Sequence, residues 1–377
     1  MKRQPELDAL RGLMLVLMTV THLPVMTAID WRSQQFGYVS SAEGFVFLSA
    51  YLVGRIYSSA ASNGGWGAVV APLWRRALKL YGYHLVTLAF AFTVGAGIAL
   101  QWHRPGLEHL LGFYLQQPHQ ALLDSLILVY CPPLMDVLPL YVLFLLLTPL
   151  VLMNAQHKGW GRVFAVSAIV WALAQWGLRR FLYDAAGALD RTALPPFNTL
   201  GAFDPFALQL LWIGGLWLGQ RHLRDPQFIR RMSPALTLGA LGVAAGLLVL
   251  RCVISGNPAG PEWLLQLLDK WHLGPLRLLN FAALTLAVLR YGQPLRKLPS
   301  GALQRLGRAS LPVFTAHVLL CLLVFAVIPE DGANLSPLAQ ALLAILTFAA
   351  LLAVATAHQN IWRLTRLTPQ RIGNSPG

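Results

Sequence analysis

Apolar runs long enough to cross a lipid bilayer recur along almost the whole chain, and they constrain the fold more than any other feature. A membrane-spanning helix needs about 20 mostly apolar residues, because a helix satisfies its backbone hydrogen bonds internally. Ten such runs, several of them interrupted by glycine or proline, lie at approximately 10–29, 42–58, 77–100, 134–153, 162–178, 205–220, 235–253, 275–291, 310–328 and 338–357. The sequence therefore predicts an all-α, polytopic integral membrane bundle of about ten transmembrane helices. Residues 1–360 would form a single domain and 361–377 a short cytoplasmic tail.

Composition and charge support a membrane protein and argue against a nucleic-acid partner. Hydrophobic residues make up 56% of the 377 positions and charged residues 12%, whereas soluble domains carry about a quarter charged residues. The net charge is +14, but no basic patch with interleaved aromatic residues is present. The basic residues instead mark the ends of apolar runs, and 21 of the 29 fall on one side of the alternating connections. This asymmetry predicts an even number of spans with both termini in the cytoplasm.

The first apolar run carries an arginine and a histidine that share one helix face. Arg11 and His22 are eleven residues apart, which at about 100° per residue returns to nearly the same direction after three turns, roughly 16 Å further along the axis. Arg11 would lie at the cytoplasmic edge and His22 near the middle of the membrane, where an ionisable group is a candidate for function. The alternative is that His22 hydrogen-bonds another helix and Arg11 snorkels to the surface. This run has the basic leader of a signal peptide but no cleavage site at the expected distance, so we expect it to be retained.

A second histidine is predicted at mid-membrane depth in the ninth run. The segment LGRASLPVFTAH ends in His317, and its basic residue Arg308 lies at the inner edge. Two mid-membrane histidines in helices that run the same way are harder to explain structurally than one. Histidine is the side chain best suited to proton transfer near neutral pH.

Three cations precede the third apolar run in the segment WRRALKLY. Arg76 and Lys79 are three residues apart and Arg75 and Lys79 four, so all three could converge on one ligand. Such a cluster suits a polyphosphate or a phosphorylated nucleotide. The alternative is the ordinary positive charge of a cytoplasmic membrane edge.

The opposite ends of the apolar runs carry acids, amides and aromatic residues. Glu43 begins the second run, where it could polarise a hydroxyl or orient an imidazole, or simply favour the helix dipole. Asp136, Asp204 and Gln209 lie at other outer helix ends, and Trp271 lies in an outer connection. Long outer connections at 101–133, 179–204 and 254–274 are expected to carry function. Their Trp and Tyr residues suit stacking on sugar rings, although an interfacial aromatic belt is the alternative.

Several common site types are not indicated. The sequence contains no P-loop, dinucleotide fingerprint, HExxH or GxSxG motif. Cys131, Cys252 and Cys321 show no spacing typical of a disulfide framework or a zinc site. We therefore expect neither a metal nor a tightly bound cofactor.

Taken in order, these motifs resemble the OpgC-type proteins within the membrane acyltransferase type-three superfamily. Arg11 and His22 resemble its Arg-x10-His signature, and FVFLSAYL at 45–52 resembles its FFxLSGFLI segment. Arg76-Ala-Leu-Lys79 resembles its Arg-x-x-Arg, with lysine as the second cation, and the segment ending in His317 resembles its LGxxSYxxYLxH helix. LDALRG and DVLPLY are closer still to the OpgC group. The matches run from residue 6 to about 317.

The resemblance implies acyl transfer across the inner membrane of a bacterium, with acyl-CoA as the donor substrate. Arg75, Arg76 and Lys79 would bind its phosphates and Arg11 its pantetheine or phosphate end, and Ser49 and Arg308 would also contact it. The lysine at position 79 keeps the charge but loses bidentate recognition. The Ser-Ala pair at 49–50, where the family has Ser-Gly, puts close helix packing in question.

The resemblance further implies roles for the central and outer residues. His22 would act as general base, with a covalent acyl-histidine as the alternative, and His317, Glu43 and Asp136 would orient it or the acceptor. Asp204, Gln209 and Trp271 would bind the acceptor, which in OpgC proteins is a periplasmic glucan that receives succinyl groups. A succinyl group would need a cation at the far end of the tunnel, and Arg277 or Arg179 could serve, whereas an acetyl group would need none.

Two other readings stay open. A transporter or flippase for a saccharide or acylated glycolipid would use the buried ionisable residues as a proton relay, but no internal repeat indicates it. A structural partner of a glucan synthase would leave the two histidines unexplained. Other saccharide acceptors, contacts with membrane lipids and a homodimer through a lipid-facing helix are all compatible with the sequence.

Overall fold

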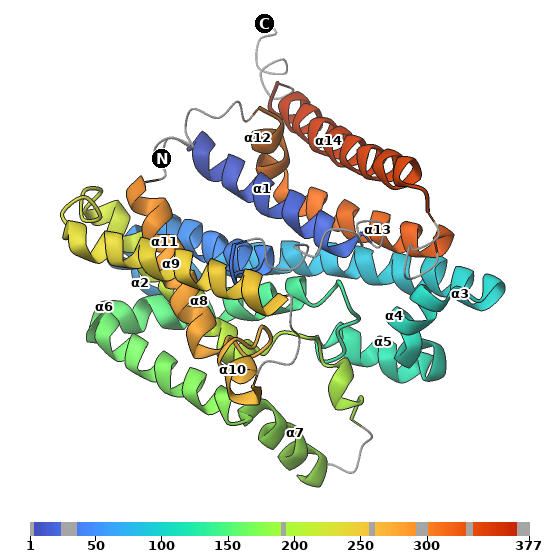
Figure 1. Ribbon diagram of the computed structural model, residues 1–377, viewed down its shortest axis with the longest axis horizontal. Coiled ribbons are helices and arrows are strands. Elements are labelled where there is room, and N and C mark those ends of the chain that lie inside the picture. The colour runs from blue at the N-terminus through green and yellow to red at the C-terminus, as the bar shows by residue number, and fades with distance from the viewer. Residues whose placement is uncertain are drawn as a thin grey trace, which may run out of the picture.

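The computed structural model describes residues 4–23, 36–189, 194–255, 261–291, 301–328 and 335–367, and within these residues it contains helices but no β-strand (Figure 1). The all-α prediction is confirmed. The helices are α1 (Pro5–His22), α2 (Ser41–Phe90), α3 (Ala96–Trp102), α4 (Pro105–Gln116), α5 (Pro118–Leu126), α6 (Val137–Gln175), α7 (Leu178–Leu189), α8 (Pro205–Arg224), α9 (Pro234–Ser255), α10 (Glu262–Leu267), α11 (Pro275–Tyr291), α12 (Gly301–Arg308), α13 (Ser310–Val327) and α14 (Pro337–Leu367). A π-helical turn, Ala91–Gly95, joins α2 to α3, and a short 3-10 helix, Phe197–Thr199, precedes α8.

Five helices of the described chain are long and apolar enough to cross a membrane: Ser41–Trp102, Val137–Gln175, Pro234–Val253, Ser310–Val327 and Pro337–Ile361. The first two each contain two of the predicted spans, because each helix bends at a glycine in the left-handed region. These are Gly65 with φ 62° and Gly159 with φ 78°, a conformation that costs glycine little. Helices of this length and composition indicate a membrane protein.

The remaining three predicted spans fall on α1, α8 and α11, which are not among these five helices. The α1 helix carries three charged residues, Glu6, Asp8 and Arg11, in its 18 positions. The α8 helix contains two glutamines and a basic last turn, and α11 is only 17 residues long. The count of ten spans and the cytoplasmic position of both termini therefore stay predictions.

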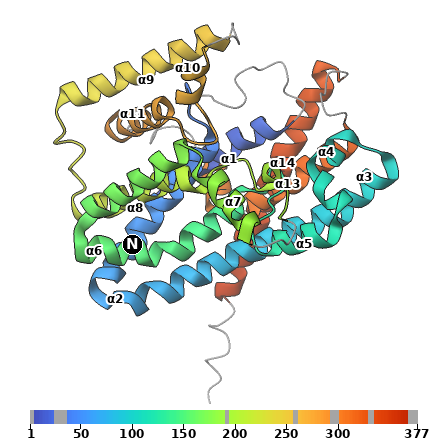
Figure 2. The same cartoon turned by 90° about the horizontal axis from the view of Figure 1, so that it is seen from below.

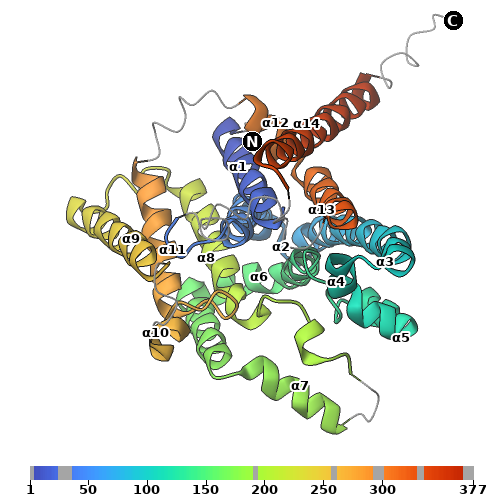
Figure 3. The same cartoon turned by 45° about the vertical axis from the view of Figure 1, so that its right-hand side comes forward.

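The central helices are α1, α2, α6, α8 and α13, which contribute most of the buried apolar residues. The α2 helix packs against both α6 and α8, and α1 packs against α12 and α13. The paired helices α9 and α11 lie on one side of this centre and α3 to α5 on the opposite side, as Figures 1, 2 and 3 all show. The candidate site lies where α1, α2, α6 and α13 meet.

Close helix crossings at this centre depend on small residues. A Cβ atom added to Gly307 on α12 would overlap with the carbonyl oxygen of Asp8 on α1. On α8, Gly215 faces Ala50 of α2, and a Cβ there would lie 2.7 Å from that of Ala50. The glycine thus makes room for the alanine at position 50, so α2 and α8 still pack closely, as small residues allow in membrane helix pairs.

Candidate active site

The two histidines predicted at mid-membrane depth contact each other. His22 is the last residue of α1 and His317 lies within α13. Nδ1 of His22 is 3.0 Å from Nε2 of His317, and the rings are stacked with centroids 5.0 Å apart and planes at 18°. Arg11, near the start of α1, hydrogen-bonds Ser310 at the start of α13. Because both pairs follow the same order along the chain, α1 and α13 run in the same direction.

The environments of the two imidazoles differ. The side chain of His317 is 1% exposed and that of His22 is partly exposed. Nδ1 of His317 has no hydrogen-bond partner within the described residues. His22 is therefore the more accessible of the two rings, and His317 is enclosed.

A cavity of about 250 Å³ lies beside this pair and contains four of the six residues predicted to bind acyl-CoA. Those four are Arg11, Ser49, Arg76 and Lys79. Arg11 of α1 therefore shares one space with Arg76 and Lys79 of α2, although it lies far from them in the sequence. The other residues that line the cavity are Phe45, Leu80, Val137, Leu138, Tyr141, Leu145, Trp212, Ser310, Leu311 and Phe314.

The other two predicted acyl-CoA residues lie outside this cavity. Arg75 is exposed, since it is one position, or about 100°, around the helix from Arg76. Arg308 is directed toward α1 and its own helix: its side chain lies 3.6 Å from the carboxylate of Asp8 and donates a 3.3 Å hydrogen bond to Gln304. The structure thus brings two of the three cations of WRRALKLY into the cavity.

Two further residues of the cavity, Ser310 and Tyr141, lie in motifs described above but were not predicted as site residues. Ser310 accepts the hydrogen bond from Arg11, and Tyr141 donates a 2.6 Å hydrogen bond to the carbonyl oxygen of Phe45. Only their position within the motifs LGRASLPVFTAH and DVLPLY could have indicated a role in the site. Neither hydroxyl is distinguished by composition or by spacing.

Two phenylalanines line the cavity, and one of them, Phe314, also contacts His317. Phe45 and Phe314 both line the cavity, and their rings are 6.4 Å apart. The ring of Phe314 also lies edge-to-face with His317 at 5.7 Å. The guanidinium of Arg11 lies 5.9 Å from the centre of the Phe45 ring, within the range of a cation–π contact. The ring of Phe314 therefore lies between the cavity and His317.

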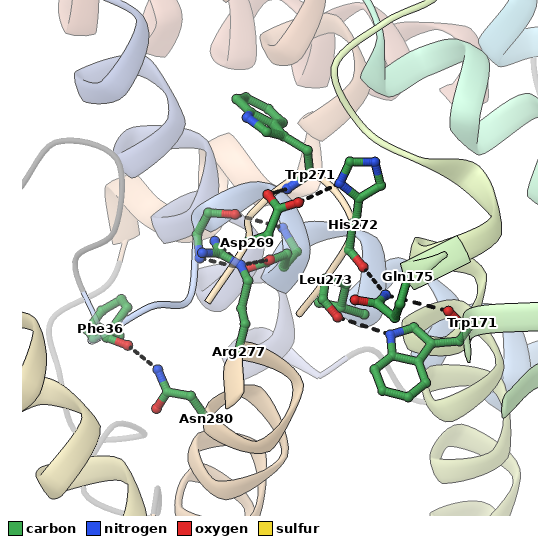
Figure 4. A network of polar contacts seen from close by, with 11 residues as sticks. Phe36, Trp171, Gln175, Asp269, Trp271, His272, Leu273, Arg277 and Asn280 are labelled. Atoms are coloured by element: carbon green, nitrogen blue, oxygen red, sulfur yellow. Dashed lines mark hydrogen bonds and ion pairs between the residues drawn. The ribbon is translucent and has the colours of Figure 1, made fainter. Parts of the chain in front are cut away.

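Glu43 occupies a buried ion pair and contacts neither histidine. Both oxygens of its carboxylate accept from Arg277 of α11, one of them from Nη2 at 3.1 Å, and both side chains are fully buried. Glu43 also accepts a 2.7 Å hydrogen bond from the backbone N–H of Ser40, which completes a capping box at the start of α2. The alternative of a helix-terminal acid is therefore observed, together with a long-range partner that the sequence did not indicate. Figure 4 shows Arg277 at the centre of this network, with Asn280 one turn further on.

Three of the outer residues lie around the loop that precedes α8. Asp136 accepts a 3.2 Å hydrogen bond from the backbone N–H of Ala202. Asp204 caps α8 by accepting from the backbone N–H of Phe206 at 2.8 Å, and its own N–H donates to the carbonyl of Trp271 at 3.0 Å. The indole of Trp271 is 41% exposed. The structure therefore brings Asp136, Asp204 and Trp271 to one region.

Gln209 lies apart from this group. It joins α8 to α6, accepting from the hydroxyl of Ser167 at 2.6 Å and donating to its carbonyl at 2.8 Å. Both residues line a second cavity, of about 510 Å³, between α6 and α8. Gln209 is thus not brought together with Asp204 or Trp271.

Asp269 and His272, in the segment before α11, form an ion pair (Figure 4). Asp269 also accepts a hydrogen bond from the backbone N–H of Trp271, which lies between them. The hydrogen bond with Asp269 raises the pKa of His272 above its usual value. Burial alone would raise the pKa of Asp269, but hydrogen bonds from His272 and from the backbone of Trp271 outweigh it and lower that pKa. Within the described residues, no group of His, Cys, Asp and Glu side chains is arranged to hold a metal ion.

Of three comparisons with known proteins, the one with protein families gives a match. No curated protein and no solved structure matches the chain. The family model described as OpgC protein matches residues 3–363, nearly the whole chain and every residue of the site described above. The protein therefore belongs to the OpgC family.

Proposed function

We propose that this protein is a membrane-bound O-acyltransferase that moves an acyl group from cytoplasmic acyl-CoA to hydroxyls of a periplasmic glucan in a bacterial inner membrane. Succinyl is the first candidate for the acyl group and acetyl the second. The observation that carries the proposal is the His22–His317 contact, one phenylalanine ring away from a cavity lined by three cations. Membership of the OpgC family implies an acyltransferase in general.

The donor side of the proposal rests on the charges of the cavity. Arg11, Arg76 and Lys79 supply three positive charges to one space, and guanidinium groups match the geometry of phosphate oxygens. The rest of the lining is largely apolar and suits a pantetheine arm. A volume of about 250 Å³ accommodates only part of a CoA molecule, so the nucleotide would stay at the cytoplasmic mouth. Phe45 and Phe314 would then have to turn aside for the thioester to reach His22.

The chemical step uses the hydrogen bond between the two imidazoles. If Nδ1–H of His22 donates to Nε2 of His317, then Nε2 of His22 keeps a free lone pair. That nitrogen takes the proton of the acceptor hydroxyl while the hydroxyl oxygen forms a bond to the thioester carbonyl carbon. The carbon–sulfur bond then breaks, and the CoA thiolate takes the proton back from His22. Direct transfer of this kind needs no covalent enzyme intermediate, and the acyl-histidine route is its alternative.

The acceptor side rests on the outer residues that the structure gathers. Trp271 offers an exposed indole face for a sugar ring. Asp136 lies nearby and could accept from sugar hydroxyls. Because Gln209 bonds Ser167 and lies elsewhere, we leave it out of the proposed acceptor site.

Release of free thiol by the purified protein tests the proposal. The protein in detergent would be offered succinyl-CoA and acetyl-CoA, with and without a β-glucan, and compared with His22→Ala. The exposed His157 provides a matched control, because His157→Ala removes an imidazole outside the site. Loss of general base catalysis should slow transfer roughly 100- to 10,000-fold, and His157→Ala should keep full activity.

The possible results separate the proposal from its competitors. Thiol release that depends on a glucan and vanishes in His22→Ala supports direct transfer. An acylated His22 found by mass spectrometry would favour the covalent route. Absence of turnover with either donor, in protein that remains folded, would reject the acyltransferase assignment and favour a transporter.

A further inference from the structure

The outer half of the site contains two arginines that already have partners. Arg277 donates from Nε and Nη2 to Glu43, and Arg179 donates to the backbone carbonyls of Leu200, Gly201 and Phe203. Neither side chain is therefore fully available to a ligand, although both were candidates from the sequence. One nitrogen of Arg277 is an exception: Nη1 is buried and has no hydrogen-bond partner within the described part of the chain. A buried donor without a partner is costly, and such a group calls for an explanation.

A third cation, Lys270, lies within electrostatic range of Arg277. Lys270 lies between α10 and α11 and is partly buried, with its ammonium 4.4 Å from the centre of the Trp271 ring. Apart from that ring contact, the ammonium makes no ion pair or hydrogen bond with any residue that the structure describes. It is within electrostatic range of Arg277, Glu43 and Asp136, and also of the His22 ring. Burial and the charge of Arg277 both lower the pKa of Lys270, while Glu43 and Asp136 oppose them.

The carboxylates of Glu43 and Asp136 do not contact the ammonium of Lys270. Glu43 has both oxygens on Arg277, and Asp136 accepts from the backbone of Ala202. Among the described residues, Lys270 and Nη1 of Arg277 thus present a charge and a donor without an ion-pair or hydrogen-bond partner, and Lys270 lies within electrostatic range of the imidazole proposed as general base. Two such donors match the two oxygens of a carboxylate.

We propose that Lys270, together with Nη1 of Arg277, binds the free carboxylate of a dicarboxylic acyl group while its thioester carbonyl lies at His22. Lys270 is thereby the residue that selects a succinyl-type donor over acetyl-CoA, which carries no second carboxylate. This inference rests on the proposed acyltransferase function and adds to it the residue that reads the carboxylate of the donor. Arg277 keeps its structural role toward Glu43 and contributes only its third nitrogen.

The test compares donors that differ in charge. The values of kcat/KM would be measured for succinyl-CoA, its carboxamide isostere and acetyl-CoA, using wild type, Lys270→Gln and Lys270→Arg. Removal of one charged hydrogen bond should lower kcat/KM for succinyl-CoA roughly 10- to 100-fold, with little change for the two uncharged donors. Lys270→Arg should recover part of the preference. Arg180→Gln is the matched control, since Arg180 is an exposed cation that pairs with Asp184 on α7.

Each outcome decides the inference separately from the proposed function. A selective loss toward succinyl-CoA in Lys270→Gln, with unchanged thermal unfolding, supports it. Acyl transfer in which Lys270→Gln keeps the wild-type preference, or in which wild type already favours acetyl-CoA, overturns the inference and leaves the acyltransferase standing. Failure of wild type to use any of the three donors overturns both.

Discussion

The buried ion pair between Glu43 and Arg277 gives the sharpest prediction about stability. Both side chains are 0% exposed, so loss of either charge leaves the other buried without compensation. Glu43→Gln isolates this effect, because glutamine at the third helical position still completes a capping box with Ser40. The shape and the cap are kept, and only the charge is removed. We expect the free energy of unfolding to fall by about 3–5 kcal/mol, the usual cost of breaking a buried pair.

The assay is equilibrium unfolding in mixed micelles of a mild detergent and SDS. The wild type, Glu43→Leu, Arg277→Met and the double variant Glu43→Leu/Arg277→Met form a cycle, and Glu43→Gln is measured beside them. Because apolar replacement of both partners is often close to neutral, the double variant should be at least as stable as either single variant. A coupling free energy well above 1 kcal/mol would show that the two side chains depend on each other.

Glu43→Gln that unfolds within about 1 kcal/mol of wild type would refute this reasoning. It would mean that water or lipid headgroups reach the pair and screen it. A variant that is stable but catalytically dead would instead support the role in orienting His22 that the family resemblance implies for Glu43. Stability and activity therefore have to be measured on the same preparation.

Two further predictions concern the two ends of the site. Arg76→Ala should raise KM for acyl-CoA roughly 10-fold, as expected for a lost charged contact, whereas the exposed Arg75→Ala should leave KM unchanged; equal effects of both would contradict binding in the cavity. The Asp269–His272 pair should stabilise the outer segment at pH below about 6.5. That stabilisation should be lost as the pH rises through the raised folded-state pKa of His272. Because the pair is partly exposed, the effect should stay below about 1 kcal/mol. Melting temperatures of wild type and Asp269→Asn across this range should therefore converge at high pH, and a constant difference would contradict the pairing.

The inner half of the site could be predicted from the sequence because it rests on local spacing. Arg11 and His22 share a helix face through their separation alone, and Arg76 and Lys79 do so through theirs. Once α1 and α13 run in the same direction, His317 meets His22 and Ser310 meets Arg11. Periodicity carries this much information because a helix turns by a fixed angle per residue. The same angle explains why Arg75, next to Arg76, lies outside the cavity.

The two bent helices, α2 and α6, were harder to predict from the sequence. Two predicted spans merge into α2 and two into α6, with bends at Gly65 and Gly159. A glycine between two apolar runs predicts a loop or a bend equally well. The choice between them depends on neighbouring helices, which spacing along one segment does not specify.

The outer half of the site depends on contacts between residues that are far apart in the sequence. Glu43 and Arg277 are 234 positions apart, and no local pattern links them. Arg179 resembled a free cation, yet it uses its donors on three backbone carbonyls of the loop before α8. Lys270 is one basic residue among several in the outer connections. Among the described residues it has no ion-pair partner, because Glu43 is bonded to Arg277 and Asp136 to the backbone of Ala202. The composition of the outer loops predicts cations on that side of the site, but which cation remains available for a substrate depends on the hydrogen bonds that the others have already formed.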